Sequence, residues 1–145
     1  MKRLWMIAFG GMLMVGSPAP AVAQESALSD ATLLCSVGHL RVCPRGEACE
    51  TADHDDYEAP RFLFIDFENR LIVSPDPDQA GRRSQIRWLE HLQDRLIIQG
   101  TDNGRAFSII ISEVDAEMTE TTVGDGFVLV ATGDCIPAKE PYRSN

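Results

Sequence analysis

Short apolar runs separated by turn-forming residues fill the stretch from Arg61 to Cys135 and predict a succession of β-strands. The run at 62–65 is apolar throughout and is followed, after the turn at Glu68-Asn69, by a second run at 71–73, so the two predict a hairpin. The unbroken apolar character of 62–65 predicts burial on both faces of that strand. Because links this short cannot make parallel crossovers, the predicted order is antiparallel.

The later runs continue the same pattern. Runs at 96–99 and 106–111 flank Asn103-Gly104, a dipeptide that tolerates the positive φ angles of a tight hairpin turn. A Thr-rich run at 118–123 follows, and Gly124-Asp125-Gly126 turns it into a last run at 127–131. With a first strand at 32–42, the chain is predicted to be all-β, an antiparallel meander of about seven or eight strands. A small barrel and a β-sandwich both satisfy this pattern.

One stretch, 84–99, fits two structures. As a helix it would begin at Ser84, with apolar residues spaced three, three and four apart at Ile86, Leu89, Leu92 and Leu96. As two strands it would turn at Gln93-Asp94. We favour the strand pair, because β-branched and aromatic residues gather at both ends of the stretch.

The N-terminal residues 1–23 have the organisation of a secretory signal peptide. Lys2 and Arg3 precede an apolar run, and Ala21-Val22-Ala23 provides a small-residue cleavage site. The apolar run is shorter than the roughly 20 residues that span a bilayer, so we expect no stable membrane insertion after cleavage. The predicted remainder is a flexible lead-in at 24–31, a single β domain at 32–137 and a disordered tail at 138–145. The expected location is periplasmic or secreted.

All four cysteines, Cys35, Cys43, Cys49 and Cys135, lie in the part predicted to be exported, where thiols oxidise. Two disulfides are therefore expected, and three pairings are open. We favour Cys43 with Cys49, because Pro44, Arg45 and Gly46 between them suit a tight turn, and Cys35 with Cys135, which would join the first strand to the last. The spacings do not contain the C-x2-C pairs typical of zinc sites.

The chain carries a net charge of −9, and loss of Lys2 and Arg3 with the signal makes the mature part more acidic still. This charge repels nucleic acid and anionic membranes, and it favours a basic protein or a cationic ligand as partner. Solubility alone is the simpler explanation of the same charge.

An acidic loop at 50–60 contains the weak metal-ligand candidates Asp53, His54, Asp55 and Asp56. Clustered carboxylates supply the oxygen ligands that hard cations prefer. The loop lacks the glycine at the sixth position and the glutamate at the twelfth that a calcium-binding EF-hand requires. A solvated loop is the alternative, and no cofactor is predicted.

Catalytic signatures are absent from the sequence. It contains no Gly-x-Ser-x-Gly elbow, and oxidised cysteines cannot supply a thiolate nucleophile. The three histidines, His39, His54 and His91, are far apart in sequence. A small hydrolase or a metal-dependent enzyme would need two or more of them to converge with acids in a cleft.

The candidate binding residues are Arg82, Arg83, Arg87 and Trp88, a basic cluster beside the one tryptophan that follows the predicted signal. Arginine and tryptophan are enriched at the energetic centres of protein interfaces. The alternative is that Trp88 belongs to the core and that the arginines balance nearby acids.

Part of the C-terminal half resembles a known group of proteins. The run Asn103-Gly104-Arg105-Ala106-Phe107-Ser108, then Met118, Gly124-Asp125-Gly126 and Gly133-Asp134-Cys135, is similar to small uncharacterised exported proteins of Gram-negative, especially α-proteobacterial, bacteria. That resemblance implies a fold and a compartment but no activity. The overall plan also resembles the periplasmic inhibitors of C-type lysozyme, although the Ser-Gly loop followed by tyrosine that those inhibitors insert into the enzyme is missing.

The function predicted from these observations is a soluble periplasmic β domain that binds a partner without catalysis. Inhibition of a cationic hydrolase such as a lysozyme is a specific form of this hypothesis. A small hydrolase or metal-dependent enzyme is the alternative from a different class.

Overall fold

The computed structural model describes residues 32–79, 81–124 and 126–138. The predicted signal peptide (1–23), lead-in (24–31) and tail, except for Ala138, lie outside these residues. The described chain contains one short 3-10 turn, η1, and ten strands, which confirms the all-β class. The elements are β1 Leu33–Ser36, β2 His39–Pro44, β3 Glu50–Thr51, β4 Phe62–Asp66, β5 Leu71–Val73, η1 Pro77–Gln79, β6 Arg83–Leu92, β7 Arg95–Asp102, β8 Arg105–Ser112, β9 Glu117–Gly124 and β10 Phe127–Pro137.

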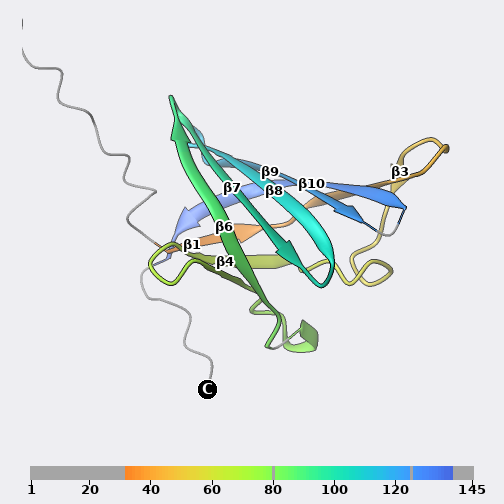
Figure 1. Cartoon of the computed structure of the whole chain (residues 1–145), viewed down its shortest axis with the longest axis horizontal. Coiled ribbons are helices and arrows are strands. Elements are labelled where there is room, and N and C mark those ends of the chain that lie inside the picture. Colours follow the sequence, from red (N-terminus) through yellow and green to blue (C-terminus); the bar gives the residue numbers. More distant parts are fainter. Residues whose placement is uncertain (1–31, 80, 125, 139–145) are drawn as a thin grey trace, which may run out of the picture.

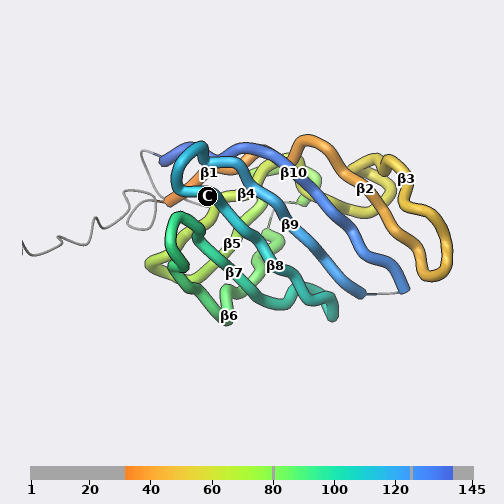
Figure 2. Tube along the Cα trace, turned by 90° about the horizontal axis from the view of Figure 1, so that it is seen from above, coloured from red at the N-terminus to blue at the C-terminus, as the bar shows by residue number. Residues whose placement is uncertain are grey.

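Eight of the strands close into a barrel (Figure 1). Strands β4 to β10 follow one another as antiparallel neighbours, β10 pairs with β1, and β1 pairs with β4. This closure decides between the barrel and the sandwich that the sequence left open. Strands β2 and β3 extend the sheet beyond the closed ring at β10 (Figure 2). Within the described residues, no helix is long and apolar enough to cross a membrane.

The single strand predicted at 32–42 is instead two strands, β1 and β2, which pair with different parts of β10. Between them, the Gly38 N–H donates to the Thr132 carbonyl at 2.8 Å, and the Asp134 N–H donates to Ser36 Oγ at 3.2 Å. A Cβ on Gly133 would lie 1.8 Å from the Ser36 carbonyl oxygen, so only glycine permits this approach. The break leaves β1 to pair with β4 and β2 to pair with β3, a short strand inside the loop predicted at 50–60.

The ambiguous stretch 84–99 forms strands β6 and β7, as we favoured. Its turn places Gln93 at a φ of 59°, and the next hairpin places Asn103 at 46° and Gly104 at 80°. Two successive positive φ angles at Asn-Gly are the geometry of a type I′ turn, which matches the twist of the flanking strands. The hairpin predicted from this dipeptide is therefore confirmed.

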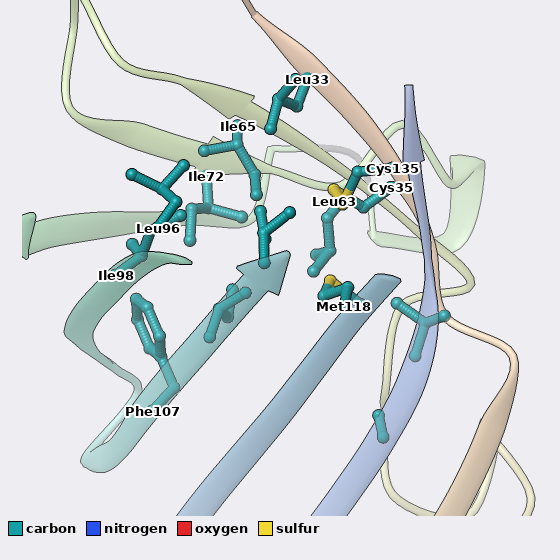
Figure 3. Close-up of a cluster of buried hydrophobic side chains, with 14 of the residues drawn as sticks. Leu33, Cys35, Leu63, Ile65, Ile72, Leu96, Ile98, Phe107, Met118 and Cys135 are labelled. Atoms are coloured by element: carbon teal, nitrogen blue, oxygen red, sulfur yellow. A yellow bond between two sulfur atoms is a disulfide. The ribbon is translucent and has the colours of Figure 1, made fainter. Parts of the chain in front are cut away.

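Inward-facing apolar side chains form one core cluster inside the barrel, part of which is drawn in Figure 3. Leu33, Ile65 and Leu96 are each fully buried there, and burial of one such side chain contributes roughly 1.5–3 kcal/mol. The Cys35–Cys135 disulfide lies in this core, and the second disulfide joins Cys43 to Cys49, so both favoured pairings are confirmed.

The prediction that 62–65 would be buried on both faces is wrong for its first residue. Leu63 and Ile65 point into the barrel and are buried, whereas Phe62 is 44% exposed and Phe64 is half-buried. The reason is the closed barrel, in which each strand has an interior face against the core and an exterior face toward solvent.

Candidate functional site

The interior of the barrel changes from apolar to charged along its axis. The inward positions of β8 carry, in order, Arg105, Phe107, Ile109 and Ile111, while β9 places Glu120 inward in line with Met118. Because β8 and β9 are antiparallel, the charged ends of the two series lie in the same half of the barrel. We call this half, where the β7–β8 hairpin and the 52–61 loop lie, the open end.

Arg82 and Asp102 form an ion pair at the open end. Arg82 Nε lies 2.7 Å from Asp102 Oδ2, and the Nη2 group contacts the same oxygen. The Nη1 group donates to the Glu58 carbonyl at 2.5 Å, so Arg82 links strand β7 to the loop that lies over the open end. Both side chains are largely withdrawn from water, at 30% and 17% exposed, which strengthens such a pair relative to one at the surface.

Glu120 lies beside this pair. Thr122 Oγ1 donates a hydrogen bond to Glu120 Oε1 at 3.1 Å. Burial raises the pKa of Glu120 above its ordinary value, because the ionised carboxylate loses hydration. The Thr122 hydroxyl and the positive charge of Arg82 oppose this rise in pKa, and the negative charge of Asp102 adds to it.

Two adjoining cavities, each of about 50 Å³, occupy the open end. Arg82, Arg105, Glu120 and Thr122 line both of them. We call this pair of cavities the lumen site. Asp102, Arg105 and Glu120 are not among the candidate site residues predicted from the sequence. Such residues could be recognised as charged residues at inward-facing positions of a strand. The sequence alone does not show which face of each strand points inward.

The acidic loop holds its candidate metal ligands in contacts within or next to the loop. His54 Nδ1 lies 3.3 Å from the Ala59 carbonyl, and Asp53 Oδ1 accepts the Asp55 N–H at 3.2 Å. Asp55 also pairs with Arg61 at 2.9 Å, while Asp56 is exposed. In the described parts of the chain, no group of three or more His, Cys, Asp or Glu side chains is placed to hold a metal ion.

The three histidines lie on separate elements. His39 begins β2 and is exposed, and His54 is in the 52–61 loop. His91, near the end of β6, contacts Glu113 at 3.1 Å. His91 is paired with Leu96 at the start of β7, close to the β6–β7 turn. The His91–Glu113 contact therefore lies at the end of the barrel opposite to the open end.

The four candidate binding residues separate into three places. Arg82 faces the lumen site, and Arg83 is exposed on β6 opposite Val73 of β5. Arg87 and Trp88 lie together on the outer surface, where the β6–β7 register shifts and both side chains point to solvent. Such a bulge redirects side chains locally. Trp88 is 48% exposed, so its alternative assignment to the core is wrong.

Trp88 begins a shallow apolar surface that runs across β6 to β10. A hollow of about 380 Å³ extends from Arg87 and Trp88 over Ala106 to Val123, which is 51% exposed. A second hollow of about 430 Å³ shares Val123 and continues to Pro44 and Arg45. We call this surface the outer strip. Among its described lining residues, Arg87 and Arg45 are the two charged ones, and they lie in different hollows.

Comparison with known proteins found no matching family model, no matching curated protein and no matching solved structure.

Proposed function

We propose that this chain is a non-catalytic binding module of the periplasm or another exported compartment, and that it docks a partner protein on the outer strip. The observation that carries the proposal is the half-exposed Trp88 within a continuous, largely uncharged hollow surface. Two disulfides are consistent with an oxidising compartment.

The composition of the outer strip is that of an interface centre. Trp88 offers a large apolar surface with few rotatable bonds, and Arg87 beside it offers a planar set of donors. The residues between Trp88 and Val123 include Ala106, Ser108 and Thr121, which are small or short and leave the surface shallow. A surface of this kind fits a protruding apolar side chain of a partner rather than an enclosed small molecule.

The overall charge selects the type of partner that approaches. A chain with a net charge of −9 attracts a basic protein over a distance set by the ionic strength and raises its association rate. In this proposal the net charge brings the partner close, and Trp88 supplies the contact that holds it. Inhibition of a basic hydrolase such as a C-type lysozyme is the specific form of the proposal.

Photocrosslinking in the native compartment tests the docking surface. A photoreactive residue replaces Val123 in the outer strip, and a matched chain carries it at Val114, which is 77% exposed in the turn after β8. We expect a discrete crosslinked partner from position 123 and none from position 114. Equal crosslinking at both positions, or none at either, contradicts docking on the outer strip.

Lysozyme titration tests the inhibitor form separately. Purified mature chain is added to C-type lysozyme at low and high salt, and cell-wall hydrolysis is measured. The inhibitor form predicts a loss of hydrolysis that weakens as salt rises, since screening reduces electrostatic steering. Unchanged hydrolysis at low salt removes the inhibitor form and leaves the crosslinking result to decide the broader proposal.

A further inference from the structure

The lumen site lies inside the barrel, whereas the outer strip lies on its surface, and Phe107 lines both. Its two cavities of about 50 Å³ adjoin and share Pro60, Arg82, Arg105, Glu120 and Thr122. A water molecule needs about 10–15 Å³ on this scale, so the pair has room for roughly seven to ten non-hydrogen atoms. A small organic molecule therefore fits in volume.

The walls of the lumen site are apolar on both sides of the charged group. Side chains from β4, β5 and β8 line the first cavity, and side chains from β2, β10 and the β1–β2 break line the second. These wall residues are Leu63, Ile72, Phe107 and Ile109 in the first cavity, and Val37, Leu40, Leu129 and Ala131 in the second. A ligand that displaces water from such walls gains from an apolar body.

The cations at the lumen site already have partners. Arg82 is bonded to Asp102 and to the Glu58 carbonyl, and the guanidinium of Arg105 lies 5.3 Å from the centre of the Phe127 ring. The carboxyl of Glu120 differs from them. Among the described residues, the hydrogen bond shown for this group is the one from Thr122 Oγ1, and a carboxylate accepts several. Glu120 therefore has acceptor capacity left for a ligand.

The charges that line the first cavity cancel when Glu120 is ionised, since Arg82 and Arg105 balance Asp102 and Glu120. Glu58 also lines the second cavity, but it is an exposed residue whose carbonyl accepts from Arg82. A charged ligand would add an unbalanced charge to a poorly hydrated site, which is costly. We propose that the lumen site binds a small uncharged alcohol, with its apolar body against the cavity walls and its hydroxyl hydrogen-bonded to the Glu120 carboxyl.

The raised pKa of Glu120 is compatible with a hydroxyl partner. A hydroxyl donates to the ionised carboxylate and accepts from the protonated acid, so it serves both forms. An ammonium group can only donate, and a carboxylate ligand would repel the ionised form.

A series of three probes with one ring tests the proposal. Cyclohexanol, cyclohexylammonium and cyclohexanecarboxylate are titrated into the purified mature chain, and the methyl signals of Ile72, Ile109 and Leu129 are followed by NMR. We expect saturable shifts with cyclohexanol and at least tenfold weaker binding of both ions. No saturable shift with cyclohexanol, which would mean that only water fills the cavities, overturns the proposal. Equal or tighter binding of either ion overturns it as well.

Variants on one strand separate a direct contact from a general effect on the fold. Glu120→Leu keeps a similar volume and removes the acceptor, while Glu117→Leu makes the same change at an exposed position of β9. We expect Glu120→Leu to weaken cyclohexanol at least fivefold and to strengthen methylcyclohexane, with neither effect in Glu117→Leu. The methylcyclohexane titration also shows that the Glu120→Leu barrel is intact. Unchanged cyclohexanol affinity in Glu120→Leu refutes the assigned contact.

Discussion

Removal of the Cys35–Cys135 disulfide should destabilise the barrel about twice as much as removal of Cys43–Cys49. The first bond links residues 100 positions apart, and the loop-closure relation gives about 4.7 kcal/mol for a loop of that length. The second bond spans 6 positions, for which the same relation gives about 2.4 kcal/mol. Domains of ordinary stability unfold at a cost of roughly 5–15 kcal/mol, so the first loss approaches the whole of a weak domain's stability.

Two double-alanine variants provide the comparison. Urea unfolding is followed by circular dichroism for the oxidised mature chain, for Cys35→Ala with Cys135→Ala, and for Cys43→Ala with Cys49→Ala. With an m-value of about 1.5 kcal/mol per molar urea, we expect the midpoint to fall by about 3 M and about 1.5 M respectively. Cys35 and Cys135 are both buried, so lost packing adds to the first effect. An equal fall in the urea midpoint for both variants, or a larger fall for the variant without Cys43–Cys49, would refute the prediction that Cys35–Cys135 stabilises the fold more.

Two further substitutions test other parts of the structure. Gly133→Ala places a Cβ against the Ser36 carbonyl oxygen, so we expect a loss of several kcal/mol or failure to fold, measured by urea unfolding. Glu120→Gln tests the raised pKa of Glu120. The native state holds this proton more tightly than the unfolded state, so wild-type stability should fall relative to the variant as pH rises from about 4.5, the ordinary pKa, through the raised value. Glu117→Gln, exposed on the same strand, is the control, and a pH-independent difference for Glu120→Gln would argue against the assigned shift.

The fold could be predicted from the sequence wherever local chemistry determines the structure. Asn103-Gly104 specifies a tight turn by itself, and the alternation of apolar residues specifies the faces of the strands around it. The disulfide pairing was favoured from local turn chemistry at Cys43–Cys49 and, for Cys35–Cys135, from the expected link between the first strand and the last.

Several features that depend on distant residues could not be predicted, although the Cys35–Cys135 bond was predicted. The break between β1 and β2 involves a close approach of Ser36 to Gly133, which is far away in the sequence, and closure of the barrel requires β1 to pair with both β4 and β10. For the same reason Phe62 was assigned to a buried face that a closed barrel leaves outside.

In the candidate sites too, local composition could be read from the sequence, whereas the arrangement produced by strand pairing could not. The composition at Arg87 and Trp88 made them candidate binding residues, but the bulge that turns both residues outward arises from the pairing of β6 with β7. The lumen site collects Arg82, Asp102 and Glu120 from three strands or their ends, and no spacing in the sequence relates them.

The most direct test of the binding-module proposal is the dependence of the Val123 crosslink on Trp88. Trp88→Ala is compared with Leu92→Ala, which removes a 54% exposed apolar side chain from the same strand. Leu92 is the last residue of β6, at the end of the strand farther from the open end. An interface centre loses 2 kcal/mol or more on truncation, which corresponds to about a 30-fold loss of affinity. We expect the crosslinked partner to disappear in Trp88→Ala and to persist in Leu92→Ala. An undiminished crosslink in Trp88→Ala would contradict docking on the outer strip.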